Sequence, residues 1–228
     1  MGSESFEALM NAASNSFFVP ADWSATQIMT ELAGHGGHEH DHEHEHEHEE
    51  EIDEHVWLSL RNAGKLVQVI ADSLAEIDAA NAGTYLANSA AYLEKLAALD
   101  AEYQKAVDSA SIKTLLFGDR FPFRYLVDDY GLNYYAAFSG CSAESEASFQ
   151  TIVFLAQKVD ELGLHAVMTL ENSLSRIAET VVSTSQAKDA KILSMDSMQS
   201  TTSNDVEAGV TYLSVMESNL QILKDALN

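Results

Sequence analysis

Histidine alternates with aspartate or glutamate along the thirteen residues from His38 to Glu50. This segment has no apolar side chain with which to bury a core, so we expect a flexible loop. Imidazole nitrogens and carboxylate oxygens are donors that suit Zn²⁺ and its neighbours in the first transition row. The pattern predicts an arm that collects a divalent metal ion through His35, His38, His40, His42, His44, His46 and His48.

Two other interpretations of this segment are a solvated charged linker and a purification tag. A tag is usually an unbroken histidine run at a terminus, whereas this run is internal and interleaved with acids. Eight of the nine histidines lie between His35 and His55. This clustering favours metal binding.

The charge of the chain also favours a cationic ligand. Its 228 residues include 12 basic and 36 acidic side chains, which gives a formal net charge of −24. Phosphate binding needs clustered lysine and arginine, so we expect no nucleic-acid partner and no attraction to anionic membranes. A divalent cation is a natural partner for such a surface. Cys141 is the only cysteine, which excludes an intrachain disulfide and a cysteine-based zinc knuckle.

Neither a membrane span nor an export signal is predicted in the sequence. No apolar run approaches the roughly 20 residues of a transmembrane helix. The start of the chain, Met1 to Asn15, lacks the basic residues and the long apolar stretch of a signal peptide. Because 46% of the residues are hydrophobic, we expect most of the chain to fold.

Helical periodicity dominates the first half of the region after the arm. The first 34 residues give only weak signals, for helices at 5–13 and 22–32 and a short strand at 17–19. From Leu66 to Tyr103, apolar residues recur at helical spacing. This pattern predicts one long helix, or two helices joined near residues 81–83.

The remainder alternates between strand and helix patterns. Strands are predicted at 112–117, 133–138, 165–170 and 190–195, and helices at 122–130, 148–162, 174–182 and 205–227. Such alternation is typical of an α/β fold with a four-stranded, mostly parallel sheet that helices flank on both faces. Ligands of such sheets bind beyond the carboxyl ends of the strands. Those ends carry Asp119-Arg120, Cys141, Glu171-Asn172 and Asp196-Ser197.

None of the common catalytic motifs occurs in the sequence. We find no dinucleotide fingerprint, P-loop, Gly-x-Ser-x-Gly elbow or His-Glu-x-x-His pair. A metallohydrolase would need an open metal position and a fixed general base, and no motif supplies them. We therefore expect a binding protein without catalytic activity.

Residues 53–63, Asp-Glu-His-Val-Trp-Leu-Ser-Leu-Arg-Asn-Ala, resemble the Asp-Pro-His-x-Trp-x-(Ser/Asn)-Pro-x-Asn-Ala signature of zinc and manganese solute-binding proteins. These proteins are the cluster A-I receptors of ABC importers, and their zinc-type members carry a histidine- and acid-rich loop before this signature. Later segments follow the family order from residue 38 to 228. They are Asp119–Leu126, Tyr130-Gly131-Leu132, Ser139–Ser148 and Asp196-Ser197.

The resemblance implies two α/β lobes joined by a long rigid helix, with the metal ion between the lobes. It divides the chain into a remnant of the amino-terminal lobe (1–34), the metal-binding loop (35–54), the signature with the long linking helix (55–110) and the carboxy-terminal α/β lobe (111–228). Most of the amino-terminal lobe would then be missing. An extracytoplasmic location, at the cell surface or in the periplasm, and delivery of Zn²⁺, or of Mn²⁺, to an ABC permease are implied as well.

The resemblance also suggests ligands for a central metal site. His55 matches the second ligand of the family, and Asp196 matches the fourth ligand of some members. Arg120 occupies a column where the family has histidine or glutamate, yet arginine has no lone pair to offer a metal ion. Either Asp119 replaces it or the site uses fewer ligands. Arg120 could equally pair with Asp119, Asp128 or Glu171.

The other candidates have weaker cases. Glu171 ends a strand at the predicted cleft and could bind the ion or support its ligands. Trp57 matches the signature but is interpreted as a packing residue. His165 begins a strand away from the cleft, so we expect no role in binding. Single loop residues, namely Cys141, Glu144 and Glu146, give only weak signals.

Two functions remain open at this point. One is a zinc-type receptor that captures an ion with its arm and hands it to a permease. The other is a metal buffer or chaperone that acts through the arm alone. The gene sequence upstream would distinguish them, because an export signal and the first ligand histidine would support the receptor.

Overall fold

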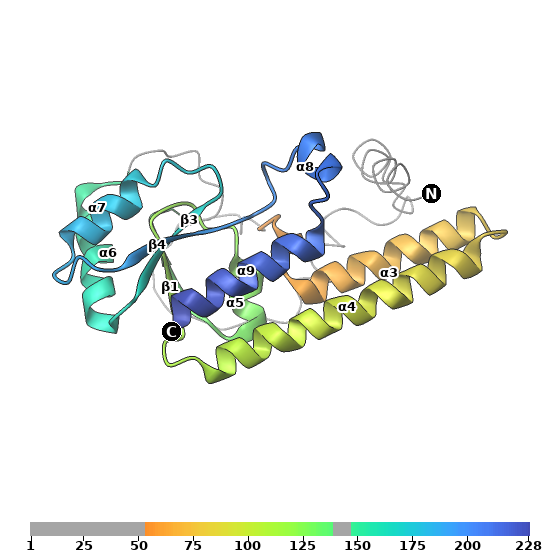
Figure 1. Cartoon of the computed structure of the whole chain (residues 1–228), viewed down its shortest axis with the longest axis horizontal. Helices are drawn as coiled ribbons and strands as arrows, with labels where there is room; N and C mark the ends of the chain where they lie inside the picture. The colour runs from red at the N-terminus through yellow and green to blue at the C-terminus, as the bar shows by residue number, and fades with distance from the viewer. Residues whose placement is uncertain (1–52, 139–146) are drawn as a thin grey trace, which may run out of the picture. The chain divides into compact units, whose positions relative to one another are not determined.

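The computed structural model describes residues 53–138 and 147–228. The chain divides into two compact units, Met1–Glu54 and His55–Asn228, and the elements of the second unit are shown in Figure 1. The predictions for residues 1–52, which include the arm, lie outside the described residues. The same is true of Cys141, Glu144 and Glu146.

Two helices that lie side by side follow the signature (Figure 1). They are α3 (Leu60–Ile77) and α4 (Ala82–Ser109), so the two-helix alternative of the prediction is confirmed. The chain leaves α3 at Asp78, whose carboxylate accepts hydrogen bonds from the Asn81 amide at 2.8 Å and the Tyr85 hydroxyl at 2.9 Å. These bonds stabilise the turn that reverses the chain into α4, the long helix that leads to the sheet.

Four strands form one sheet, in which each neighbouring pair is parallel and the order is β2-β1-β3-β4. All four strands were predicted from the sequence within two residues at each end. Their bounds are Thr114–Phe117 for β1, Asn133–Ala136 for β2, Ala166–Leu170 for β3 and Lys191–Met195 for β4. The α/β fold with a four-stranded parallel sheet is therefore confirmed.

Helices cover both faces of this sheet (Figure 1). Successive residues of a strand point to opposite faces. Leu116 and Val167 accordingly belong to the core formed with α6 (Phe149–Leu162) and α7 (Arg176–Thr184). The next residues along these strands, Phe117 and Met168, belong to the core on the other face, which is formed with α4, α5 (Arg124–Tyr130) and α9 (Tyr212–Leu227). The two cores cover the central strands β1 and β3 on both sides, as parallel sheets require.

The prediction of a single closing helix over residues 205–227 is wrong. The structure has a short α8 (Ser203–Glu207) and a separate α9 (Tyr212–Leu227). Gly209 between them has a φ of +93°, a conformation that ends a helix and that glycine adopts without a Cβ penalty. Thr211 then starts α9, since its side chain accepts a hydrogen bond from the Ser214 N–H at 3.1 Å.

In the part of the chain that the structure describes, no helix is long and apolar enough to cross a membrane.

Candidate metal site

Carboxylates follow three neighbouring strands of the sheet. Glu171 and Asp196 come directly after β3 and β4, and Asp119 lies two residues after β1. Because the strands are parallel, these three residues share one edge of the sheet. Asp119 accepts a hydrogen bond from Leu170 N–H at 3.3 Å through one oxygen and from Arg120 N–H at 2.8 Å through the other. The carboxylate thereby fixes the end of β1 against the end of β3.

The residues Asp196–Met198, which we term the β4 turn, are held by several hydrogen bonds. Asp196 Oδ1 accepts from the Met198 N–H at 2.7 Å, and Met198 has a φ of +62°. Asn219 of α9, which is buried, accepts from the Asp196 N–H at 2.9 Å and donates to the Asp196 carbonyl at 2.8 Å. Asn219 of α9 therefore binds both the backbone N–H and the backbone carbonyl of Asp196.

Glu171 contacts the same turn with both carboxylate oxygens. One oxygen accepts the Ser197 N–H at 2.8 Å, and the other accepts the Ser197 hydroxyl at 2.7 Å. The Ser200 hydroxyl donates to that second oxygen at 3.2 Å. Hydrogen bonds to an ionised carboxylate are about twice as strong as neutral ones, so Glu171 stabilises the position of the turn.

His55 is linked to this turn by the short helix that follows it. The imidazole is 3% exposed, and its ring centroid is 5.3 Å from that of Trp57. Trp57, in η1 (Val56–Leu58), donates its indole N–H to the Ser197 carbonyl at 3.0 Å. The Tyr212 hydroxyl donates to the Trp57 carbonyl at 2.7 Å. Trp57 was interpreted as a packing residue, but it also joins the His55 segment to the β4 turn.

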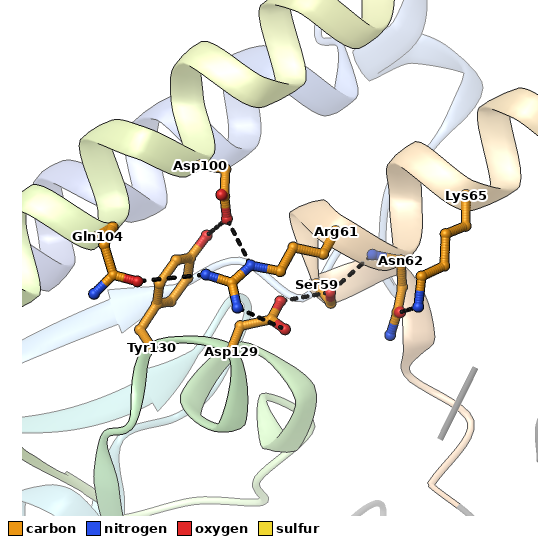
Figure 2. Close-up of polar contacts among 8 residues, drawn as sticks. All are labelled: Ser59, Arg61, Asn62, Lys65, Asp100, Gln104, Asp129 and Tyr130. Carbon is orange, nitrogen blue, oxygen red and sulfur yellow. Dashed lines mark hydrogen bonds and ion pairs between the residues drawn. The ribbon is translucent and has the colours of Figure 1, made fainter. Parts of the chain in front are cut away.

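A second set of contacts fixes the start of α3 (Figure 2). Ser59 caps this helix by accepting the Asn62 N–H at 2.9 Å, and it donates to Asp129 Oδ2 of α5 at 2.6 Å. Arg61 reaches from α3 toward α4 and α5. Its Nε lies 3.2 Å from Asp100 Oδ1 and its Nη1 3.8 Å from Asp129 Oδ1. The His55 segment is thus held at both ends, by the β4 turn and by α5.

Burial changes the acidity of two carboxyl groups in these contacts. It raises the pKa of Asp196 above the ordinary value of 3.8, and the charge of Glu171 adds to this effect, while the bond from Met198 N–H opposes it. Burial also raises the pKa of Asp129, against the lowering effects of the Ser59 hydroxyl and the Arg61 guanidinium. A cation close to Asp196 would favour its ionised form.

Arg120 does not form any of the three ion pairs that were considered for it. The residue is exposed, and within the described residues its guanidinium has no ion-pair partner; only its backbone N–H contacts Asp119. Asp128 pairs instead with Arg124, whose Nε lies 4.0 Å from Asp128 Oδ2. His165 is exposed and precedes β3, at the opposite end of that strand from Glu171. The expectation that His165 takes no part in binding stays a prediction.

Among residues 53–138 and 147–228, no three histidine, cysteine or acidic side chains lie close enough to hold a metal ion together. Ser197 links these candidates indirectly, because it binds Glu171, follows Asp196 in the chain and accepts the indole N–H of Trp57, which stands two residues after His55. Sequence reasoning missed Asn219 and Asp129, and it named Ser197 beside Asp196 without giving it a role. Asn219 had one usable signal, because it stands among the buried apolar residues of α9, where a polar side chain needs a partner.

Comparison with known families gives an extensive match. The family model described as "ZnuA: Zinc-uptake complex component A periplasmic" matches residues 2–226. The zinc-binding lipoprotein AdcA of Streptococcus pneumoniae is 37% identical over 191 residues, which are 84% of this chain and 35% of AdcA. The high-affinity zinc uptake system protein ZnuA of Bacillus subtilis is 32% identical over 83% of this chain and 58% of its own length. This chain thus spans about a third of AdcA and somewhat over half of that ZnuA.

Solved structures support the same relationship. The Zn(II)-bound ZnuA-like domain of Streptococcus pneumoniae AdcA superposes with a TM-score of 0.63 and 35% identity, over 78% of this chain and 64% of that one. The metal-dependent lipoprotein YcdH of Bacillus subtilis gives a TM-score of 0.67 and 29% identity, over 77% of this chain and 64% of YcdH.

Proposed function

Because the chain belongs to the family of zinc-uptake complex component A, we propose that it is a receptor that binds Zn²⁺ and delivers it to the permease of an ABC importer. The relatives named above are called zinc-binding or zinc-uptake proteins, and the AdcA domain holds Zn(II). These names favour zinc over manganese, a choice that the sequence left open. The proposed activity is capture and delivery, without a catalytic step.

The observation that supports a central site is the buried imidazole of His55, which Trp57 ties to the turn that begins with Asp196. An imidazole nitrogen and a carboxylate oxygen are both common ligands of Zn²⁺. We propose that His55 and Asp196 bind the ion directly. Burial of His55 excludes water from one side of the site and strengthens its electrostatic attraction for the cation.

Asp119 takes a weaker role in this proposal. Both of its oxygens already accept backbone N–H groups, from Arg120 and Leu170. We propose that Asp119 contributes negative charge at this edge of the sheet. This charge partly offsets the positive charge of Arg120, which stands at the position where the family has a histidine or glutamate ligand. A positive side chain at that position opposes the approach of a cation, so a neighbouring carboxylate is needed to offset it.

The arm performs the capture step in this mechanism. Its seven histidines, at positions 35 to 48, bind zinc weakly and raise the local concentration of the ion near the central site. A tethered ligand transfers within one molecule, so its effective concentration depends on the length of the tether rather than on the bulk metal. Location outside the cytoplasm follows as part of the same proposal, since AdcA is named a lipoprotein and the family model is called periplasmic.

A competition titration against a zinc chelator tests the central site. The protein is the chain without residues 35–50, so that arm sites do not mask the result. His55→Ala and Asp196→Asn should each weaken zinc binding at least tenfold, about 1.4 kcal/mol. His165→Ala, which removes an exposed histidine at the far end of β3, is the matched control and should bind zinc as the parent does.

Two outcomes would contradict the receptor site. If His55→Ala and Asp196→Asn bind zinc as tightly as the parent, the ion is not held at the β4 turn. If removal of residues 35–50 abolishes all zinc binding, the arm alone carries the activity and the buffer alternative holds.

A further inference from the structure

Glu171 directs both carboxylate oxygens to Ser197, and one of them also accepts the Ser200 hydroxyl. Both oxygens accept hydrogen bonds from Ser197, at 2.8 Å from the N–H and at 2.7 Å from the hydroxyl. Ser197 is 1% exposed. A buried backbone N–H without a partner is destabilising, so the main chain of the β4 turn itself requires this carboxylate.

Ser197 connects Glu171 to both proposed ligands, Asp196 and His55. It follows Asp196 directly in the sequence, and its carbonyl accepts the Trp57 indole N–H at 3.0 Å. Trp57 stands two residues after His55, and their rings are in contact. A shift of Ser197 would therefore move the main chain of Asp196 and loosen the segment that carries His55.

We propose that Glu171 is a positioning residue for the zinc site, which acts through Ser197 and does not bind the ion. This inference rests on the proposed site at His55 and Asp196. It chooses between the two roles that the sequence left open for Glu171, which were binding the ion and supporting its ligands. Groups that orient metal ligands commonly contribute about 10- to 100-fold to metal affinity.

Glutamine at position 171 separates the two roles. Its amide oxygen can accept the Ser197 N–H, and its NH₂ group can donate to the Ser197 hydroxyl, which then acts as acceptor. Glu171→Gln thus keeps both contacts, but its amide nitrogen has no lone pair for a metal ion. Glu171→Ala loses both contacts. Glu179→Gln, on the exposed side of α7, removes one negative charge from the same lobe and serves as the charge control.

The indole N–H of Trp57 reports on the site in the full chain. The protein has two tryptophans, so its ¹⁵N–¹H spectrum has two indole signals, and Trp23→Phe identifies the one from Trp57. In metal-free protein, Glu171→Ala should shift this signal and speed its exchange with solvent, whereas Glu171→Gln should leave it near its original position. Zinc is then added in a chelator buffer, with His55→Ala as the variant that lacks a ligand.

The positioning role predicts a specific order of zinc affinities from the Trp57 signal. Glu171→Ala should need at least about tenfold more free zinc than the parent, and Glu171→Gln and Glu179→Gln about the same as the parent, within roughly threefold. Equal weakening by Glu171→Gln and Glu171→Ala would mean that the carboxylate binds the ion. An unchanged metal-free Trp57 signal in Glu171→Ala would refute the contact through Ser197.

Failure of the proposed function gives a different result. The Trp57 signal of the parent would then not respond to zinc, or His55→Ala would titrate as the parent does. That outcome overturns the site at His55 and any role of Glu171 toward zinc. The metal-free spectra would still show whether Glu171 holds the β4 turn.

Discussion

Replacement of Asn219 by alanine should weaken the fold at the β4 turn. Asn219 is 1% exposed on α9, and its side-chain amide forms two hydrogen bonds with the main chain of Asp196. Alanine removes both partners and leaves the N–H and the carbonyl of Asp196 without them. The loss falls on the residue that we propose as a zinc ligand.

The magnitude follows from these two backbone groups. A buried polar group that loses its partner costs about 1–3 kcal/mol, and two groups give roughly 2–6 kcal/mol. Because Asp196 is only partly buried, water can reach the space that the shorter side chain leaves. We therefore expect a loss of about 2–4 kcal/mol in the free energy of unfolding, which lowers the Tm by roughly 4–16 °C for a chain of this size.

Urea unfolding, followed by far-ultraviolet circular dichroism in the absence of metal, measures this loss. The control is Asn88→Ala on the exposed side of α4, where alanine is the better helix former and the stability should stay the same or rise slightly. A change for Asn219→Ala of less than about 0.5 kcal/mol, with the same dependence on urea, would refute the reasoning. The amide of Asn219 would then add nothing to the position of Asp196.

Three further outcomes are expected. Deletion of residues 35–50 should lower the zinc stoichiometry measured by calorimetry, and an unchanged stoichiometry would exclude the arm as a zinc-binding segment. In the full chain, the arm sites should lose zinc as the pH falls through the histidine pKa of about 6.5. Burial raises the folded-state pKa of Asp129 above its unfolded value of 3.8, so its stabilising contribution is present below that value and is lost as the pH rises through the raised pKa. Asp129→Asn should flatten this fall in stability in urea titrations, and a pH profile identical to that of the parent would contradict it. Arg120→His should strengthen zinc binding about tenfold, or 1.4 kcal/mol, in a chelator competition, with Arg124→His unchanged as its control; no gain would mean that this position does not face the ion.

The helices and strands of the second unit could be predicted because their signals are local. Short apolar runs marked the strands, and amphipathic periodicity marked α6 over residues 148–162. The closing helix was predicted without its break, although the break has local causes too. A glycine inside a helix costs only about 1 kcal/mol, so Gly209 by itself did not indicate a separate α9.

The sequence by itself determined the chemistry of the ligands and the family. Histidines spaced among acids can bind a first-row cation wherever the chain places them, and the segment around His55 carried enough of the signature to identify the zinc-type receptors. Arg120 could be excluded as a ligand on the same ground, because a guanidinium has no lone pair in any fold.

Only the tertiary structure decided which groups hold these candidates in place. Ser197 binds Trp57, 140 positions away in the sequence, and Glu171, 26 positions away, and Asp196 binds Asn219 at a separation of 23. No helix or strand period relates such pairs, so a sequence pattern cannot pair them. The parallel sheet places Glu171 and Asp196 at one edge, because its strand ends meet there, and η1 and α9 bring Trp57 and Asn219 to the same turn.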